Sequence, residues 1–188
     1  MRYQKPTLYL TGDTLYVDIR MDSLFTRRSQ DAIASGMTTS ISHEIELESR
    51  DTRKIRQIIS LRLDHDIWEG RYRITRQGAS PDTLVTDQFT EAEVYASTLN
   101  QFPIATLPDV EAPFLLRIRS AVNPISPEQE AKTRKWLNLL ERGSVLELFF
   151  SLAPTDQQGS WIELARFRKS DLPTEVPSPL PEDETSEP

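Results

Sequence analysis

The sequence predicts a mainly β protein: an antiparallel β-sandwich-like domain or open barrel of seven to eight strands, with two or three short connecting helices. The first observation behind this prediction is the stretch 37–76, where apolar residues recur at every second position over three consecutive runs. That period is typical of strands with one buried face. The second observation is that helix-like segments do not alternate regularly with strand-like ones, which disfavours a doubly wound parallel sheet.

The chain divides into one domain and a tail. Its 188 residues are enough for a domain with a sizeable core, which we place at residues 7–168. Residues 169–188 are predicted to be a disordered, acidic, proline-rich tail, since positions 171–188 hold six acids, five prolines and no base. Without these six acids the net charge of −7 falls to about −1, so the acidic balance says nothing about what the domain binds.

Two strands and a helix are expected in the first 36 residues. A short strand is predicted at 7–10 and a longer, alternating strand at 15–21. The segment 26–35 has the apolar spacing of a short helix, with Thr26 as its N-cap and Gly36 as its C-terminal stop.

Two long strands are expected at 37–48 and 55–67, joined by a turn around Asp51. Apolar residues and both histidines occupy one face of these strands, while charged and hydroxyl side chains dominate the other. We predict the register that brings opposite charges together, with Leu47 opposite Ile55, Glu46 opposite Arg56 and Glu48 opposite Lys54.

A second, tight turn at Glu69-Gly70 is expected to lead into the next strand. This turn sets Asp66 opposite Arg73 as an ion pair. It also sets Trp68 opposite Arg71, where a cation–π contact would support the hairpin.

The second half of the chain predicts further helices and strands. One helix begins at Phe89 and runs to about Gln101, where Pro103 ends its reach, and Thr90 and Glu93 form a capping box at its start. The other expected elements are a short strand at 83–86, a strand at 114–122, a helix at 127–142, and a final hairpin of strands at 145–152 and 161–167.

The two histidines are the natural candidates for a metal or acid–base site. The predicted register separates His43 from His65 by six residues along the ladder, or about 20 Å. Zinc needs its ligand nitrogens roughly 2.0–2.1 Å from one ion, so we expect no shared metal site. Asp64 and Asp66 flank His65, but in a strand they point away from it, which predicts a solvated row of ion pairs instead.

A dense set of basic residues suggests nucleic acid or anionic lipid as a partner. Two of these bases are paired with glutamates by the predicted register, and the aromatic interleaving of a single-strand binder is missing. We therefore expect no nucleic-acid binding from these residues: Arg50, Arg53, Lys54, Arg56, Arg62, Arg71, Arg73 and Arg76.

The sequence predicts no catalytic residue, no cofactor and no metal. The chain has no cysteine, and its six glycines are isolated rather than gathered into a phosphate-binding loop. A serine nucleophile is expected to lack a histidine in suitable geometry. No apolar run reaches the length of a membrane-spanning helix, and none has the form of a signal peptide, so neither membrane insertion nor an export signal is predicted.

The order of these segments resembles the bacterial domain-of-unknown-function family four-three-nine-zero. The resemblance rests on LYVDIRM, DSLFTRRSQDAIASGMTTSISHEIEL, ISLRLDHDIWEGRYRITRQG and TDQFTEAEVYASTLNQF, and covers roughly residues 8–168. Ala34-Ser35-Gly36 lies close to the helix-ending pattern of the family, Tyr72 matches the second tyrosine of a strand pattern, and residues 88–93 match a helix start. In place of the first tyrosine stands His65 or Asp66.

The resemblance implies a small β-rich bacterial protein, usually exported to the cell envelope, with no established activity, cofactor or catalytic residue. The chain departs from the family in lacking an export signal. Its location is therefore expected to be the envelope or periplasm if a signal lies upstream, and the cytoplasm as the sequence is written.

Taken together, the sequence predicts a non-enzymatic interaction or scaffold module of a bacterial cell envelope, with a protein as its expected partner. Two alternatives stay open. One is a carrier of small apolar ligands that uses the interior of the sandwich. The other is a hydrolase with a pair of carboxylates in a cleft between the sheets.

Overall fold

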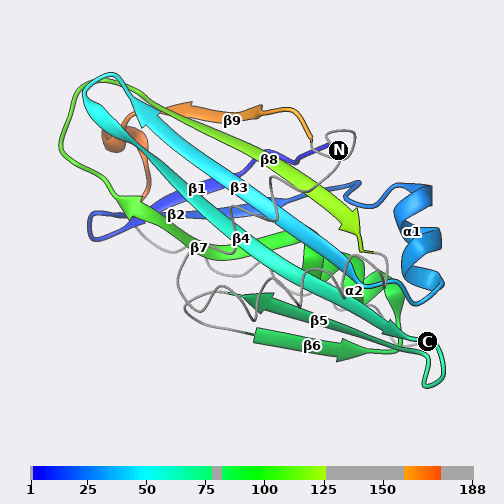
Figure 1. Cartoon of the computed structure of the whole chain (residues 1–188). Coiled ribbons are helices and arrows are strands. Elements are labelled where there is room, and N and C mark those ends of the chain that lie inside the picture. The colour runs from blue at the N-terminus through cyan, green and yellow to red at the C-terminus, as the bar shows by residue number, and fades with distance from the viewer. Residues whose placement is uncertain (1, 78–81, 126–158, 175–188) are drawn as a thin grey trace, which may run out of the picture.

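The computed structural model describes residues 2–77, 82–125 and 159–174, and within them it confirms a mainly β, sandwich-like fold. These residues form nine strands in two antiparallel sheets, with two α-helices, which is one strand more than predicted (Figure 1). The predicted helix at 127–142 and the predicted strand at 145–152 lie outside the described residues.

The smaller sheet has three strands in the order β1-β2-β7. The strands β1 (Thr7–Thr11) and β2 (Thr14–Arg20) form a hairpin whose turn contains Gly12, at a φ of +60°. The third strand, β7 (Thr98–Thr106), pairs with the other edge of β2.

The larger sheet has six strands in the order β6-β5-β4-β3-β8-β9. Its centre consists of the three long strands β4, β3 and β8, which Figure 1 shows running side by side across the molecule. The bounds are β3 (Thr39–Ser49), β4 (Thr52–Asp66), β5 (Arg71–Gln77), β6 (Asp82–Thr86), β8 (Phe114–Pro124) and β9 (Ile162–Phe167).

The core lies between the two sheets. Alternate residues of β2 point into it from one side, and alternate residues of β3, β4 and β8 point into it from the other. One continuous apolar cluster joins them, and its most deeply buried members include Leu15, Val17, Ile41, Leu63 and Ile118. This confirms the alternating pattern from which the strands were predicted.

The predicted register of the first long hairpin is confirmed. Leu47 lies opposite Ile55 and Glu46 opposite Arg56, as the charge pattern indicates. An irregularity between Leu47 and Ser49 displaces Glu48 from the direct pairing with Lys54 that was predicted.

The helix α1 (Arg27–Ala34) has the predicted limits, since the hydroxyl of Thr26 accepts a hydrogen bond from the Ser29 N–H at 3.3 Å. Gly36 follows it at a φ of +82°, a left-handed conformation that glycine adopts without steric cost.

The helix α2 (Phe89–Ser97) starts as predicted, but the predicted capping box and end are wrong. Its N-cap is Gln88, whose side chain makes no capping bond; instead the Thr86 hydroxyl accepts from the Gln88 N–H at 3.1 Å. After Ser97 the chain passes directly into β7, because pairing with β2 outweighs the local helix preference of this segment.

Pro103 lies inside β7, an edge strand, where its missing N–H deprives no neighbouring strand of a hydrogen bond. The pairing with β2 is irregular here, and Gln101 has a positive φ of 49°. The Gln101 N–H donates to Asp18 Oδ1 at 2.6 Å, which satisfies the backbone at this irregularity.

The structured part continues past the predicted domain boundary at residue 168. Lys169–Asp171 form a short 3-10 helix, and the Leu10 N–H donates to the Pro173 carbonyl at 2.9 Å. Lys169 Nζ also reaches Asp13 Oδ1 at 2.9 Å. The predicted disordered tail, residues 169–188, therefore starts too early, and its remainder, residues 175–188, lies outside the described residues.

Candidate functional site

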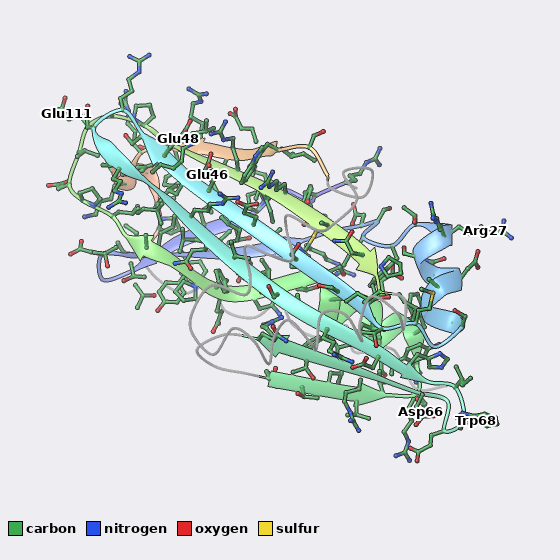
Figure 2. All side chains as sticks on the ribbon, in the orientation of Figure 1. Arg27, Glu46, Glu48, Asp66, Trp68 and Glu111 are labelled. Atoms are coloured by element: carbon green, nitrogen blue, oxygen red, sulfur yellow. The ribbon has the colours of Figure 1, made fainter. Side chains whose placement is uncertain are left out.

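The most exposed large apolar side chains lie in the turn between β4 and β5. Trp68 is 92% exposed and its neighbour Ile67 is 52% exposed, at the far end of the long central strands (Figure 2). Large apolar residues are usually buried, and tryptophan is enriched among the residues that dominate binding energy at protein interfaces. This turn is therefore the first candidate site.

The turn has four residues, so the predicted tight turn is wrong. Asp66 lies opposite Arg71, two positions from the predicted pairing with Arg73, and Trp68 lies inside the turn rather than across from Arg71. The cause is the Asp66 carboxylate, which accepts hydrogen bonds from the backbone N–H groups of Trp68 at 2.9 Å and of Glu69 at 3.1 Å.

These two hydrogen bonds define the shape of the turn. The Glu69 and Trp68 N–H groups stabilise the charged carboxylate and lower the pKa of Asp66 below its ordinary value. Gly70 completes the turn at a φ of +65°. The exposed tryptophan thus extends from a turn with a defined conformation.

Aromatic packing supports the base of this hairpin. The rings of His65 and Tyr72 stack with their centroids 4.2 Å apart, and Tyr72 packs edge-on against Phe89 of α2 at 5.6 Å. His65 Nδ1 also lies 3.1 Å from the carbonyl oxygen of Ile33 in α1, to which it donates. Both helices therefore contact the strand ends that present Trp68.

A surface pocket of about 550 Å³ is the second candidate site. It lies where α2 meets the β5–β6 hairpin and the start of β7. Its lining is mixed in polarity and comprises Arg76, Asp82, Thr90, Glu91, Val94, Tyr95, Thr98 and Asn100.

Tyr95 connects the charged groups of this pocket. The Arg76 guanidinium lies over the Tyr95 ring, 5.0 Å from its centroid, and the Tyr95 hydroxyl donates to Asp82 Oδ2 at 2.8 Å. Burial, and secondly the hydrogen bond to Asp82, raise the pKa of Tyr95. Arg76 and Asp82 lie directly opposite each other in the strands, yet they are not within ion-pair distance.

Two polar atoms beside this pocket are buried and have no hydrogen-bond partner in the described structure: Arg76 Nε and Thr98 Oγ1. Arg76 Nη2 donates to the Thr98 carbonyl at 3.4 Å, so the two residues are held together. Leaving a buried polar group unpaired costs about 1–3 kcal/mol. Such groups are rare in folded proteins and call for an explanation.

His43 and Ser120 form an unexpected pair inside the core. His43 Nδ1 lies 2.8 Å from Ser120 Oγ, although the sequence predicted no histidine near a serine in such geometry. His43 is completely buried and Ser120 is 1% exposed. Burial, with a smaller contribution from the Arg76 charge, lowers the pKa of His43 to about 4. No substrate can reach the pair without opening the core, so its geometry fits a structural role.

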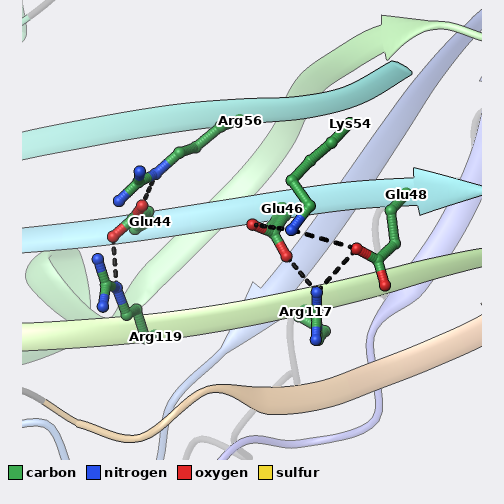
Figure 3. Close-up of polar contacts among 7 residues, drawn as sticks. All are labelled: Glu44, Glu46, Glu48, Lys54, Arg56, Arg117 and Arg119. Atoms are coloured by element: carbon green, nitrogen blue, oxygen red, sulfur yellow. Dashed lines mark hydrogen bonds and ion pairs between the residues drawn. The ribbon is translucent and has the colours of Figure 1, made fainter. Parts of the chain in front are cut away.

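The outer face of the large sheet holds a charge ladder, defined here as Glu44, Glu46, Glu48, Lys54, Arg56, Arg117 and Arg119 (Figure 3). The glutamates of β3 lie between cations of β4 and β8. Arg56 and Arg119 both pair with Glu44, whose side chain is only 1% exposed. Lys54 Nζ reaches Glu46 at 3.1 Å and Glu48 at 3.3 Å. The pairs Lys54–Glu46 and Arg56–Glu44 are diagonal to the β3–β4 register, whereas Arg117 and Arg119 pair with the glutamates directly opposite them on β3.

The sequence assigned these glutamates to the outer face but missed their burial. The ring of Trp161 lies against Arg119 at 4.8 Å and Arg117 at 5.9 Å, and so shields the β8 side of the ladder. The signal was present in the sequence as three glutamates at alternate positions facing alternating cations on two other strands. The cations of β8 could not be included in the prediction, because the pairing of β8 with β3 was not predicted.

Five of the eight basic residues considered for nucleic acid have defined side-chain contacts. Four pair with carboxylates: Lys54, Arg56, Arg62 and Arg71. The fifth, Arg76, contacts Tyr95 and the Thr98 carbonyl. The four salt bridges reduce the positive charge available to phosphate.

The two histidines have separate surroundings, since His43 Nε2 lies 2.9 Å from the Ala96 carbonyl while His65 contacts α1. Within residues 2–77, 82–125 and 159–174, no group of three or more His, Asp or Glu side chains is placed to hold a metal ion. In the same residues no helix is long and apolar enough to span a membrane.

No protein-family model, no curated protein and no solved structure matches this chain. The resemblance to the domain-of-unknown-function family four-three-nine-zero stays a prediction.

Proposed function

We propose that this chain is a non-enzymatic interaction module that binds a protein partner through the β4–β5 turn. The observation behind the proposal is the 92% exposure of Trp68 on a turn whose conformation is fixed by Asp66. A turn whose backbone is already fixed loses little backbone entropy on binding, so more of the burial of its aromatic side chain contributes to affinity. Ile67 adds apolar surface beside it.

The charges around the turn support a protein rather than a nucleic acid as the partner. Arg71 and Glu69 are both mostly exposed and lie 3.8 Å apart, and Asp66 adds a further negative charge. Phosphate backbones are bound by an excess of positive charge, which the turn does not have. An apolar pocket on a protein surface complements a tryptophan with balanced charges at its rim.

The two alternatives have weaker support. A hydrolase would need two carboxylates that face one substrate, whereas the Tyr95 hydroxyl binds Asp82 at the first residue of β6 and the Thr86 hydroxyl binds Glu91 at the last residue of β6. A carrier of apolar ligands would need space between the sheets, whereas buried apolar side chains form one cluster there and the pocket lies at the surface. A bacterial envelope location is part of the proposal through the family resemblance only.

The proposal is tested by placing a photo-crosslinking amino acid at position 69, beside Trp68, in cells that express the protein, because Glu69 is exposed in the same turn. The matched control is position 85, because Val85 is 50% exposed on the edge strand β6. We expect a discrete protein adduct from position 69 that position 85 does not give, and we expect the added substitution Trp68→Ala to abolish the adduct from position 69. Equal adducts from both positions, or an adduct from position 69 that survives Trp68→Ala, or no adduct from position 69, would contradict the proposal.

A further inference from the structure

We propose that the pocket between α2, β5, β6 and β7 binds a short zwitterionic peptide by its two charged termini. This inference is independent of the function proposed for the Trp68 turn, which lies outside the pocket lining. It rests on the separation of positive and negative groups within one cavity of about 550 Å³, a volume typical of small-molecule sites.

Tyr95 keeps the two charges of the pocket apart. Opposite charges on directly opposed residues of neighbouring strands normally attract each other, as Arg76 and Asp82 would. Instead the Tyr95 ring lies under the Arg76 guanidinium, and the Tyr95 hydroxyl holds the Asp82 carboxylate at 2.8 Å. The pocket therefore has a positive side and a negative side, neither neutralised by the other.

The positive side is suited to a carboxylate. The Arg76 Nε and the Thr98 hydroxyl lie together without hydrogen-bond partners, and Arg76 has no ion pair among the described residues. A guanidinium and a hydroxyl are both donors that a carboxylate accepts from, and a small shift of the Arg76 side chain would present them to it.

The negative side is suited to an ammonium group. Asp82 accepts one hydroxyl hydrogen bond, from Tyr95, which leaves further acceptor positions on its carboxylate. Glu91, which accepts from Thr86 at the other end of β6, adds a second negative charge to the lining. A single anion would be repelled by these acids and a single cation by Arg76, so a ligand with both charges is favoured.

The length of the ligand follows from the aromatic ring between the two sides. In a single amino acid the two charged groups share one carbon, whereas successive Cα atoms of a peptide are about 3.8 Å apart. A dipeptide or tripeptide therefore spans the ring better. Val94, which is 49% exposed, offers apolar surface to its side chains.

The test titrates the full-length protein with the dipeptide alanyl-leucine and follows backbone amide signals by NMR. We expect saturable shifts at Tyr95, Thr98 and their neighbours. The N-acetylated dipeptide, which lacks the ammonium, and the dipeptide amide, which lacks the carboxylate, should each bind about tenfold more weakly.

Two variants assign the two sides. Asp82→Asn should weaken alanyl-leucine binding about tenfold but leave the affinity for the N-acetylated dipeptide unchanged. Arg76→Gln should also weaken alanyl-leucine binding about tenfold, but leave the affinity for the dipeptide amide unchanged. The matched control Arg73→Gln lies on the same strand outside the pocket lining and should change neither. Because the ligand series uses the unaltered protein, it decides the matter even if a variant fails to fold. Absence of saturable shifts, or equal binding of the three ligands, would overturn the inference.

Discussion

His43 Nδ1 lies 2.8 Å from Ser120 Oγ in the core, so the two side chains are joined by a hydrogen bond. Because His43 Nε2 faces the Ala96 carbonyl at 2.9 Å, this nitrogen must hold a hydrogen. The Ser120 oxygen accepts from the Tyr3 hydroxyl at 3.0 Å, and its own hydrogen can reach either His43 Nδ1 or Met21 Sδ at 3.5 Å. Burial favours the neutral imidazole, in which Nδ1 accepts from the Ser120 hydroxyl.

The first prediction is that the free energy of unfolding decreases at acidic pH because His43 becomes protonated. Its pKa is about 4 in the folded protein against 6.5 for the free side chain, so the unfolded chain binds the proton more tightly. The stabilisation is complete above about pH 6.5, declines as the pH falls toward 4, and amounts to about 3 kcal/mol. Urea denaturation at several pH values measures it.

The control for this prediction is the second histidine. His43→Gln should remove most of the pH dependence of the free energy of unfolding between pH 4 and 6.5, whereas His65→Gln should keep it. An unchanged slope in His43→Gln would show that other groups cause the acid sensitivity.

The second prediction concerns the charge ladder. Glu44→Gln should destabilise the fold by about 2 kcal/mol or more, because Arg56 and Arg119 lose the carboxylate that lies buried between them. Glu48→Gln should cost less than about 1 kcal/mol, since the Glu48 side chain is 32% exposed and its pairs are screened by water. Midpoints of urea denaturation compare the two variants, and equal losses would contradict a special role for burial.

The ladder also shows how far the sequence determines the fold. Alternation and charge placed Leu47 opposite Ile55, since only one register buries the apolar face and pairs the charges. The burial of Glu44 was not predictable in the same way, because it depends on β8, which lies about 70 residues further along the chain.

Elements were missed where tertiary contacts overrode local preference. The predicted helix extended to about Gln101, yet residues 98–106, with Pro103 among them, pair with β2 as an edge strand. The turn after β4 is longer than predicted because the Asp66 side chain bonds two backbone N–H groups. The pocket is lined by residues from α2, from β5 and β6, and from β7, so no single stretch of sequence indicated it.

The third prediction tests the role of Tyr95 in separating Arg76 from Asp82. Tyr95→Phe keeps the ring but frees the Asp82 carboxylate, which can then pair with Arg76. We expect weaker binding of alanyl-leucine in the NMR titration, with a loss of stability of about 1 kcal/mol from the missing hydrogen bond. Tyr16→Phe, on β2 and outside the pocket lining, is the control and should leave peptide binding intact.

The last prediction separates the conformation of the Trp68 turn from the stability of the fold. Gly70 and Gly12 both have φ near +60°, and an added Cβ would meet nothing within 4 Å at either position. Gly70→Ala and Gly12→Ala should therefore each cost about 1 kcal/mol of unfolding free energy, from backbone strain alone.

The two variants should differ in partner capture. Gly70→Ala alters the turn that presents Trp68, so it should reduce the crosslinked adduct from position 69, whereas Gly12→Ala lies in the β1–β2 turn and should leave the adduct unchanged. Because the stability losses are matched, unequal adducts report the shape of the turn itself. Equal reduction in both variants would mean that capture follows stability, and the proposed recognition of Trp68 on a preorganised turn would then fail.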